Sequence, residues 1–269
     1  MKKVLTIAGS DSSGGAGIQA DLKTFSAHGT FGMSVITAVT AQNTQGVFAV
    51  QDIDVDIITK QIAAIFDDIS VDGVKIGMVS RSETIRTIAS GLIHYKAQNI
   101  VVDPVMISKS GYYLLQKDAT LALVSCLLPL ATVLTPNIPE AEEISGLKIQ
   151  SLKDMEEAAR KIHALGPRYV LLKGGHREAD ATDILFDGEK FEHLVTPRIA
   201  THNTHGTGCT LSSAITANLA QGYGVQEAVS RGKKYIHTAI EHSFSIGKGV
   251  GPVHHFYNLY KEAGILNDK

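Results

Sequence analysis

The chain contains 269 residues, of which 44% are hydrophobic and 19% are charged, with 25 basic and 27 acidic side chains. Its formal net charge of -2 excludes the strongly basic surface that non-specific nucleic-acid binding requires. The length and apolar content suffice for one folded domain, residues 1–269, and the lack of low-complexity tracts argues against disorder.

The chain begins with an apolar run that we expect to form a buried strand, Val4–Ala8. This run is too short for a signal peptide, and no segment approaches the length of a transmembrane helix. The two cysteines, Cys126 and Cys209, lie far apart in unlike contexts, which argues against a disulfide. A reducing cytoplasm is therefore the expected location.

A glycine-rich loop, residues 9–17, follows the first strand and precedes a predicted helix from about Ile18 to His28. Its spacing is not the G-x-G-x-x-G of dinucleotide-binding loops, and no Gly-Lys-Ser/Thr closes it as in a P-loop. We therefore expect this loop to contact a small molecule. Asp21, early in the helix, is either a ligand-binding carboxylate or a solvated side chain on the helix face.

The next predicted strand, Phe31–Val39, leads into the uncharged polar run 40–44, which contains Gln42. Such a run suits hydrogen bonding to a neutral heterocycle, although a polar turn has the same composition. Strands and helices alternate along the rest of the chain. Further helices are predicted at 55–66, 82–95, 117–128 and 151–165, and three more begin near Glu140, Gly208 and Val225. Further strands are predicted at 73–78, within 99–106, and at 131–134, 169–173, 183–186 and 191–195.

This alternation indicates a three-layer α/β/α domain with a mainly parallel central sheet. Within it, Cys126 lies among leucines and is expected in the core. Three predicted strands end in polar residues: Asp103, the run Thr135–Glu140, and Lys173-Gly174-Gly175-His176. Because the C-terminal ends of parallel strands form the ligand-binding edge of such sheets, we expect these residues to line the site.

The stretch Thr204-His205-Gly206-Thr207-Gly208-Cys209 is a glycine-rich turn directly before a helical pattern. Such a turn presents unpaired backbone N–H groups and the positive end of the helix dipole, which together favour a phosphate group. Cys209 falls in the first turn, where we expect the pKa of its thiol to be lowered. The alternative is an ordinary helix start with a small cysteine in the core.

Seven stretches of the chain, residues 6–21, 40–44, 75–78, 102–106, 135–142, 173–176 and 205–209, match one family as a set. With them the chain resembles the hydroxymethylpyrimidine (phosphate) kinases of thiamine biosynthesis, in the vitamin-kinase branch of the ribokinase superfamily. The resemblance implies a single ribokinase-like domain, ATP and Mg²⁺ as cofactors, and a homodimer. It also implies phosphorylation of 4-amino-5-hydroxymethyl-2-methylpyrimidine to its monophosphate and then to its diphosphate.

The resemblance implies that Cys209 acts as the base toward the substrate hydroxyl, where related sugar kinases have an aspartate. Gly206, Thr207 and Gly208 would supply backbone donors to the phosphoryl group in transit. Lys173 would lie near the nucleotide phosphates, so Lys173 and Gly208 would also bind the nucleotide.

Asp103 and Glu140 are implied to hold Mg²⁺, directly or through water, and Asn137 to support the nucleotide phosphates. The pyrimidine would be held by two hydrogen-bonding side chains at its edge and two apolar side chains against its ring. These implied substrate-binding residues are Asp21, Gln42, Met78 and Val105. One stretch departs from the family pattern: Lys109-Ser110-Gly111-Tyr112-Tyr113 stands where relatives often have Gly-Gly after a basic residue.

Three other functions were weighed against the pyrimidine kinase. A pyridoxal or pyridoxine kinase, or an enzyme with both activities, acts on a similarly flat hydroxymethyl heterocycle. A non-catalytic pyrimidine sensor would have no use for the combination of Asp103, Glu140, Lys173 and Cys209. A metal hydrolase built on His202 and His205 lacks a third ligand cluster.

Overall fold

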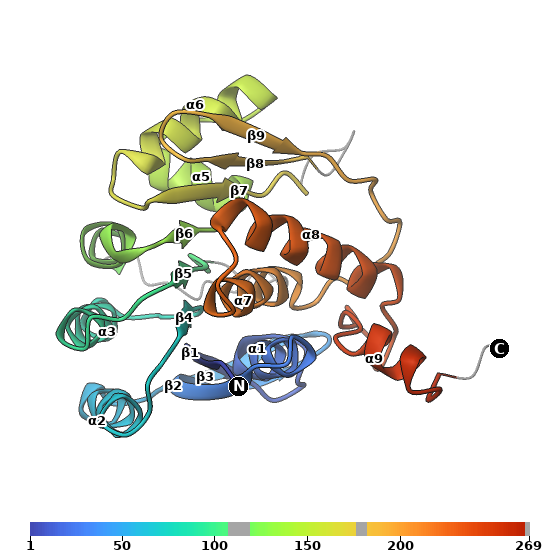
Figure 1. The fold of residues 1–269 in the computed structure, drawn as a ribbon, viewed down its shortest axis with the longest axis horizontal. Coiled ribbons are helices and arrows are strands. Elements are labelled where there is room, and N and C mark those ends of the chain that lie inside the picture. The colour runs from blue at the N-terminus through green and yellow to red at the C-terminus, as the bar shows by residue number, and fades with distance from the viewer. Residues whose placement is uncertain (107–118, 176–181, 267–269) are drawn as a thin grey trace.

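The computed structural model describes residues 1–106, 119–175 and 182–266, which form three layers with a central sheet between helices (Figure 1). Lys109–Tyr113, the stretch that departs from the family pattern, and His176 lie outside these residues. The strands are β1 (Lys3–Asp11), β2 (Phe31–Asn43), β3 (Gly46–Asp52), β4 (Gly73–Ile76), β5 (Ile100–Val102), β6 (Val133–Leu134), β7 (Tyr169–Leu172), β8 (Asp183–Phe186) and β9 (Phe191–Leu194). Their order in the sheet is β3-β2-β1-β4-β5-β6-β7-β8-β9.

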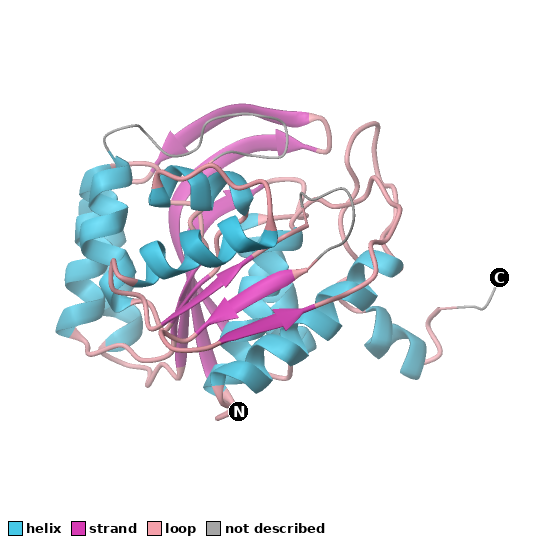
Figure 2. Cartoon of the chain, turned by 90° about the horizontal axis from the view of Figure 1, so that it is seen from above, coloured by secondary structure: helices cyan, strands magenta, loops and turns pink. Residues whose placement is uncertain are grey.

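Strands β2, β1, β4, β5, β6 and β7 are parallel to one another, whereas β3 pairs antiparallel with β2 at one edge and β8 and β9 pair antiparallel at the other. The predicted three-layer α/β/α architecture with a mainly parallel sheet is thus confirmed. Figure 2 shows the strands fanning across the molecule with helices on either side. The strands predicted at 183–186 and 191–195 form a hairpin, with Phe186 paired to Phe191 around the Asp187-Gly188 turn.

Two groups of helices cover the two faces of the sheet. The helices are α1 (Gly17–Ala27), α2 (Val55–Phe66), α3 (Ser82–His94), α4 (Ala119–Ala122), α5 (Ile138–Ser145), α6 (Leu152–His163), α7 (Thr207–Ala220), α8 (Val225–Glu241) and α9 (Tyr257–Glu262). One face packs against α2, α3, α5 and α6 and holds the larger apolar cluster. The other packs against α1, α7 and α8. Apolar strands buried on both sides are the expected result of this layering.

Several predicted elements differ in extent. β1 continues to Asp11 and β2 to Asn43, because Ser10 and Asp11 pair with Val39 and Thr40 beyond a bulge. Gln42 therefore lies on a strand. The sequence pattern did not indicate β3 or α9, which are short and largely exposed.

The helix predicted at 117–128 has a different form in its described part. It consists of α4, a π-helical turn at Leu123–Leu127 and a 3₁₀ turn at Leu128–Leu130. The prediction that Cys126 is a core residue is wrong: its side chain is half-buried at the margin of the larger cluster, beside the Arg86 guanidinium at 3.7 Å. None of the described helices combines the length and the apolarity that crossing a lipid bilayer requires.

Candidate active site

The predicted phosphate turn, residues 205–209, opens α7 at the C-terminal edge of the sheet. Gly206 is the N-cap residue with φ 77°, in the left-handed region that favours glycine. A side chain there would also meet the Gly15 carbonyl, only 1.8 Å from the position of an added Cβ. The first hydrogen bond of the helix runs from the Thr210 N–H to the Gly206 carbonyl at 2.9 Å. The N–H groups of Gly208 and Cys209 precede it in the first turn, where the helix provides them with no acceptor.

Three of the predicted residues converge beside this turn. The Lys173 ammonium lies 3.0 Å from Asp103 Oδ1, and the same oxygen accepts a hydrogen bond from the Thr135 hydroxyl at 3.2 Å. Gly208 faces this pair, because an added Cβ would lie 3.4 Å from both Asp103 Oδ2 and Lys173 Nζ. The tips of β5 and β7 and the start of α7 therefore meet around one small space. That space is lined by a carboxylate, an ammonium and helix N–H groups.

Asn137 and Glu140 form a capping box at the start of α5. The Asn137 side chain accepts from the Glu140 N–H at 2.9 Å, and the Glu140 carboxylate accepts from the Asn137 N–H at 2.8 Å. Burial raises the pKa of Glu140 to about 7, with Lys173 acting in the opposite direction and Asp103 in the same direction. Because the charges of Lys173 and Asp103 both act on Glu140, Lys173 and the two carboxylates predicted to bind Mg²⁺ belong to one electrostatic cluster. The Asn137 amide NH₂ is not used by the cap and can donate to a ligand.

Asp21 occupies a different environment from the one predicted. It is fully buried and is neither solvated nor open to a ligand in this structure. Its two oxygens receive the Lys75 ammonium at 2.9 and 2.8 Å, the Thr6 hydroxyl at 2.6 Å and the Ser213 hydroxyl at 2.7 Å. Burial lowers the pKa of Lys75, but the charges of Asp21, Cys209 and Asp103 and the hydrogen bond to Asp21 together outweigh it, and the net shift is upward. In this structure the Asp21 carboxylate is paired with Lys75 and is not open to the direct substrate contact that was expected.

Cys209 lies half-buried in the first turn of α7, close to this ion pair. The expected lowering of its pKa is wrong. Burial raises the pKa of the thiol to about 11, and Asp21 and Asp103 act in the same direction, against Lys75 and the Gly17 N–H. Desolvation disfavours the thiolate more than the helix end stabilises it.

The other predicted substrate residues lie at the tips of β2, β4 and β5. The Met78 sulfur is 3.2 Å from the position of an added Cβ at Gly9, and Val105 closes a tight turn by donating to the Asp103 carbonyl at 2.8 Å. The Gln42 amide nitrogen is 3.4 Å from His205 Nε2. That nitrogen of His205 must carry its proton, because it lies 2.7 Å from Asp11 Oδ2, which is only an acceptor. It cannot also accept from Gln42, so the Gln42 NH₂ remains available to a ligand.

Sequence reasoning missed four residues of this region: Asp11, Lys75, His205 and Ser213. Lys75 carried a signal, since a lysine within an otherwise apolar strand needs a buried partner. Ser213 carried none, because a serine on a buried helix face resembles any small core residue. Asp11 and His205 also carried none, because their role depends on a contact between residues that lie 194 positions apart in the sequence.

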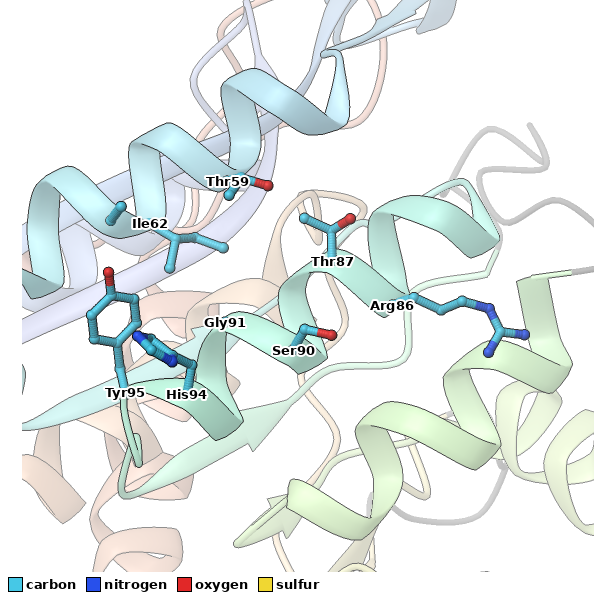
Figure 3. A pocket seen from close by; sticks show the side chains of 9 residues that line it. Thr59, Ile62, Arg86, Thr87, Ser90, Gly91, His94 and Tyr95 are labelled. Carbon is cyan, nitrogen blue, oxygen red and sulfur yellow. The ribbon is translucent and has the colours of Figure 1, made fainter.

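The described surface also has a hollow away from this site. A cavity of about 540 Å³ lies between α2 and α3, and Figure 3 shows residues that line it, such as Thr59, Arg86, Ser90 and His94. It lies on the helical layer and not at the strand tips that carry Asp103 and Lys173. Its lining has no pairing of carboxylate and ammonium with a helix N-terminus, so it does not provide the chemistry of the phosphate turn.

The residues predicted for Mg²⁺ fit that ion in type. Mg²⁺ usually keeps several waters and takes one or two carboxylates together with substrate phosphates. Asp103 and Glu140 offer two carboxylates beside the phosphate turn, although Lys173 now neutralises Asp103. In the three described segments there is no group of three or more His, Cys, Asp or Glu side chains arranged to hold a metal ion. A site of this kind would therefore depend on the nucleotide.

A mainly parallel sheet with a glycine phosphate turn opening a helix at its C-terminal edge defines the class of ribokinase-like small-molecule kinases. The pattern of the family described as "Phosphomethylpyrimidine kinase" matches residues 11–254, and the chain belongs to that family. It is 54% identical to the hydroxymethylpyrimidine/phosphomethylpyrimidine kinase of Rhizobium meliloti, over 96% of this chain and 98% of the relative.

Another relative is longer. The thiamine biosynthesis bifunctional protein ThiED of Geobacter sulfurreducens is 53% identical over 94% of this chain, which spans only 52% of that protein's length. Among solved structures, the phosphomethylpyrimidine kinase of Clostridium difficile is 57% identical with a TM-score of 0.81, covering 89% of this chain and 100% of that one. An ADP complex of Bacillus subtilis pyridoxal kinase is 45% identical with a TM-score of 0.89, covering 95% and 98%.

Proposed function

We propose that the chain transfers the terminal phosphoryl group of ATP to the hydroxymethyl group of 4-amino-5-hydroxymethyl-2-methylpyrimidine. We propose further that it converts the resulting monophosphate to the diphosphate, in thiamine biosynthesis. The observation that carries the proposal is the convergence of Gly208, Asp103 and Lys173 at the start of α7. The names of the relatives at 53–57% identity agree with this substrate.

In the proposed reaction, the acceptor hydroxyl oxygen forms a bond to the terminal phosphorus while the bond from that phosphorus to the bridging oxygen of ADP breaks. The N–H groups of Gly208 and Cys209 donate to the phosphoryl oxygens, and Lys173 offsets their charge. Phosphoryl transfer needs positioning and charge neutralisation more than covalent help. Loss of one such donor typically costs on the order of 3 kcal/mol in the barrier.

Cys209 would take up the hydroxyl proton in its thiolate form, which is a small fraction of the thiol at neutral pH. Asp103 and Glu140 are the proposed ligands of Mg²⁺, which would neutralise phosphate charge, and the Asn137 NH₂ would donate to the nucleotide phosphates. On the acceptor side, the Gln42 NH₂ would donate to a ring nitrogen of the pyrimidine. Met78 and Val105 would pack against its ring, and Asp21 would act through Lys75.

A second candidate is pyridoxal kinase activity, alone or beside the first. It is favoured by the high TM-score of 0.89 to the Bacillus subtilis pyridoxal kinase. The test is a coupled ADP-release assay with the pyrimidine alcohol, its monophosphate and pyridoxal side by side. We expect kcat/KM for the pyrimidine alcohol to exceed that for pyridoxal at least tenfold, with turnover of the monophosphate as well. A reversed ratio would favour the second candidate, and no ADP release with any acceptor would favour a non-catalytic sensor.

We also propose a homodimer in the cytoplasm. Val39 and Phe48, on neighbouring strands at the β3 edge of the sheet, are 48% and 67% exposed, which is unusual for apolar side chains of this size. Light scattering coupled to size exclusion tests the mass, and a monomer at micromolar concentration would contradict the dimer. Two free cysteines agree with a reducing compartment.

A further inference from the structure

Two loops that are distant in sequence are fastened together at the proposed site. We call residues 11–17 the acceptor loop, and residues 205–209 are the phosphate turn. At one end, His205 Nε2 lies 2.7 Å from Asp11 Oδ2. In the middle, Gly206 packs directly on the Gly15 carbonyl. At the other end, the Gly17 backbone N–H lies close enough to the Cys209 thiol to lower its pKa. Both loops are held along their whole length.

Asp11 organises the acceptor loop from within. Its Oδ1 accepts from the Ser13 N–H at 2.8 Å and the Ser13 hydroxyl at 2.7 Å, and its Oδ2 accepts from the N–H groups of Gly15 at 3.1 Å and Ala16 at 2.8 Å. Burial acts to raise the pKa of Asp11, but the bonds from His205 and Ser13 lower it to about 2. The carboxylate is therefore charged at every pH at which the enzyme would work. Most of its acceptor capacity serves this loop and His205.

His205 is fixed from the opposite side. Its own N–H donates to the Gly251 carbonyl at 3.0 Å, and its ring packs over Gly15, where an added Cβ would lie 2.3 Å from the ring carbon Cδ2. Residue 205 thus contacts two other segments of the chain: its backbone N–H bonds Gly251, and its imidazole contacts the acceptor loop. Because the two loops are mostly glycine, alanine and serine, apolar packing between them is slight and polar contacts must set their separation.

We propose that Asp11 and His205 are a positioning pair for phosphoryl transfer. By holding the acceptor loop against the phosphate turn, they set the distance between the acceptor hydroxyl and the phosphoryl group. Neither residue is assigned a contact with the reacting atoms. The catalytic part of this inference rests on the proposed kinase function. A misplacement of about 1 Å between reacting groups can cost about a hundredfold in rate. We call the bond between Asp11 and His205 the latch, and its loss should therefore lower kcat measurably.

The test is a double-mutant cycle with Asp11→Asn, His205→Ala and the double variant, measuring kcat and KM in the ADP-release assay. Each single variant should lower kcat at least fivefold while KM for ATP changes less than threefold, because Asn137 and Lys173 are untouched. The double variant should lose no more than about the worse single one, as expected of two groups that act together. If His205→Ala does not fold, His205→Asn, whose shorter amide does not reach Asp11, takes its place.

A matched pair of controls exists elsewhere in the chain. His193 and Glu156 form the same kind of contact at 3.0 Å, between β9 and α6. His193→Ala and Glu156→Gln should leave kcat within twofold of the parent enzyme. The proposal would be overturned by a loss below fivefold in either single variant at the latch. A double variant whose loss is the product of the two single losses, or a change in KM for ATP of threefold or more, would overturn it as well.

A second readout does not depend on turnover. In a Cys126→Ser background, Cys209 is the only thiol, and its rate of alkylation by iodoacetamide reports on the Gly17 contact. Opening the latch should raise this rate at least twofold in Asp11→Asn and His205→Ala, but not in Glu156→Gln. A smaller rise would contradict the coupling between the latch and the phosphate turn. If the parent enzyme phosphorylates none of the acceptors, the proposed function fails, and alkylation still decides whether the latch holds the loops.

Discussion

The Lys75 ammonium lies 2.9 and 2.8 Å from the two carboxylate oxygens of Asp21, and neither side chain is exposed to solvent. A buried pair of this kind contributes little over an apolar pair, but breaking it leaves an uncompensated charge in the core. The pair joins β4 to α1 beneath Cys209, at the point where the acceptor side of the proposed site meets the sheet.

Lys75→Met should therefore lower the free energy of unfolding by about 3–5 kcal/mol, since Asp21 loses its partner. The double variant Lys75→Met with Asp21→Asn should recover at least half of this loss. Urea denaturation measures the free energy of unfolding of both variants. The control is Lys2→Met, which removes an exposed contact with Asp72 at 3.0 Å and should cost less than about 1 kcal/mol. Equal losses in Lys75→Met and Lys2→Met would show that the buried charge is not decisive.

The parts of the fold that could be predicted are those with strong local patterns. The parallel strands and their helices have continuous apolar runs or single apolar stripes, and the helix predicted from residue 151 begins at Ser151, which forms a capping box with Asp154. The short edge strand β3 has no such pattern, because its burial depends on its pairing with β2. Prediction also placed Asp103 and Lys173 correctly at the C-terminal ends of their strands and Gly208 in the turn that opens a helix.

The electrostatic state of the site could not be predicted, because it depends on contacts across the whole chain. The sequence position of Cys209 indicated a lowered pKa, but the burial that raises it comes from packing that the sequence pattern does not reveal. The sequence predicts Asp21 as a substrate-binding carboxylate, with a solvated helix-face carboxylate as the alternative, but the side chain is buried beside Lys75, 54 residues away.

The raised pKa of Cys209 leads to a test of its role as a base. If the thiolate accepts the hydroxyl proton, kcat should rise as pH increases from 7 to 10, because the thiolate fraction grows about tenfold per unit below the pKa of about 11. Cys209→Ala should lower kcat by about a hundredfold and abolish this slope. A pH–rate profile of both proteins is the measurement. A Cys209→Ala enzyme with unchanged kcat would remove the residue from the reaction.

Glu140 predicts a pH dependence of stability in the absence of divalent cations and nucleotide. Its carboxyl has an ordinary pKa of 4.5 and a folded pKa of about 7, raised by burial. The folded state therefore holds the proton more tightly. The stability due to Glu140 is complete below pH 4.5 and is lost as pH rises through 7.

Glu140→Gln keeps a side-chain acceptor for the Asn137 N–H but has no proton to lose. Relative to this variant, the parent protein should lose on the order of 3 kcal/mol of unfolding free energy between pH 4.5 and 8. Urea denaturation across this range measures the difference, and Glu143→Gln, on the exposed side of the same helix, is the control. Parallel curves for Glu140→Gln and the parent protein would show that Glu140 titrates normally.

Two glycines of the phosphate turn should separate folding from activity. In Gly208→Ala the new methyl lies 3.4 Å from Asp103 Oδ2 and Lys173 Nζ, which is an ordinary contact, so the melting temperature should hardly change. Activity should nevertheless fall by about a hundredfold or more, because the methyl occupies the space assigned to the phosphoryl group.

Gly206→Ala should behave differently, because it combines a left-handed φ of 77° with a clash against the Gly15 carbonyl. We expect it to lose stability as well as activity. Thermal melts and kcat for the two variants make the comparison. A Gly208→Ala enzyme with full activity would show that the phosphoryl group does not pass beside Asp103 and Lys173.

The bond between Asp11 and His205 can form only late in the synthesis of the chain on the ribosome. Asp103, Asn137, Glu140 and Lys173 are all synthesised before the turn that completes their site, and Asp11 waits for its partner until residue 205 has left the exit tunnel. Domains generally fold as units during synthesis. Under the proposed function, a nascent chain that stalls earlier would carry the charged strand tips without the turn proposed to bind the phosphoryl group, and we expect it to transfer none.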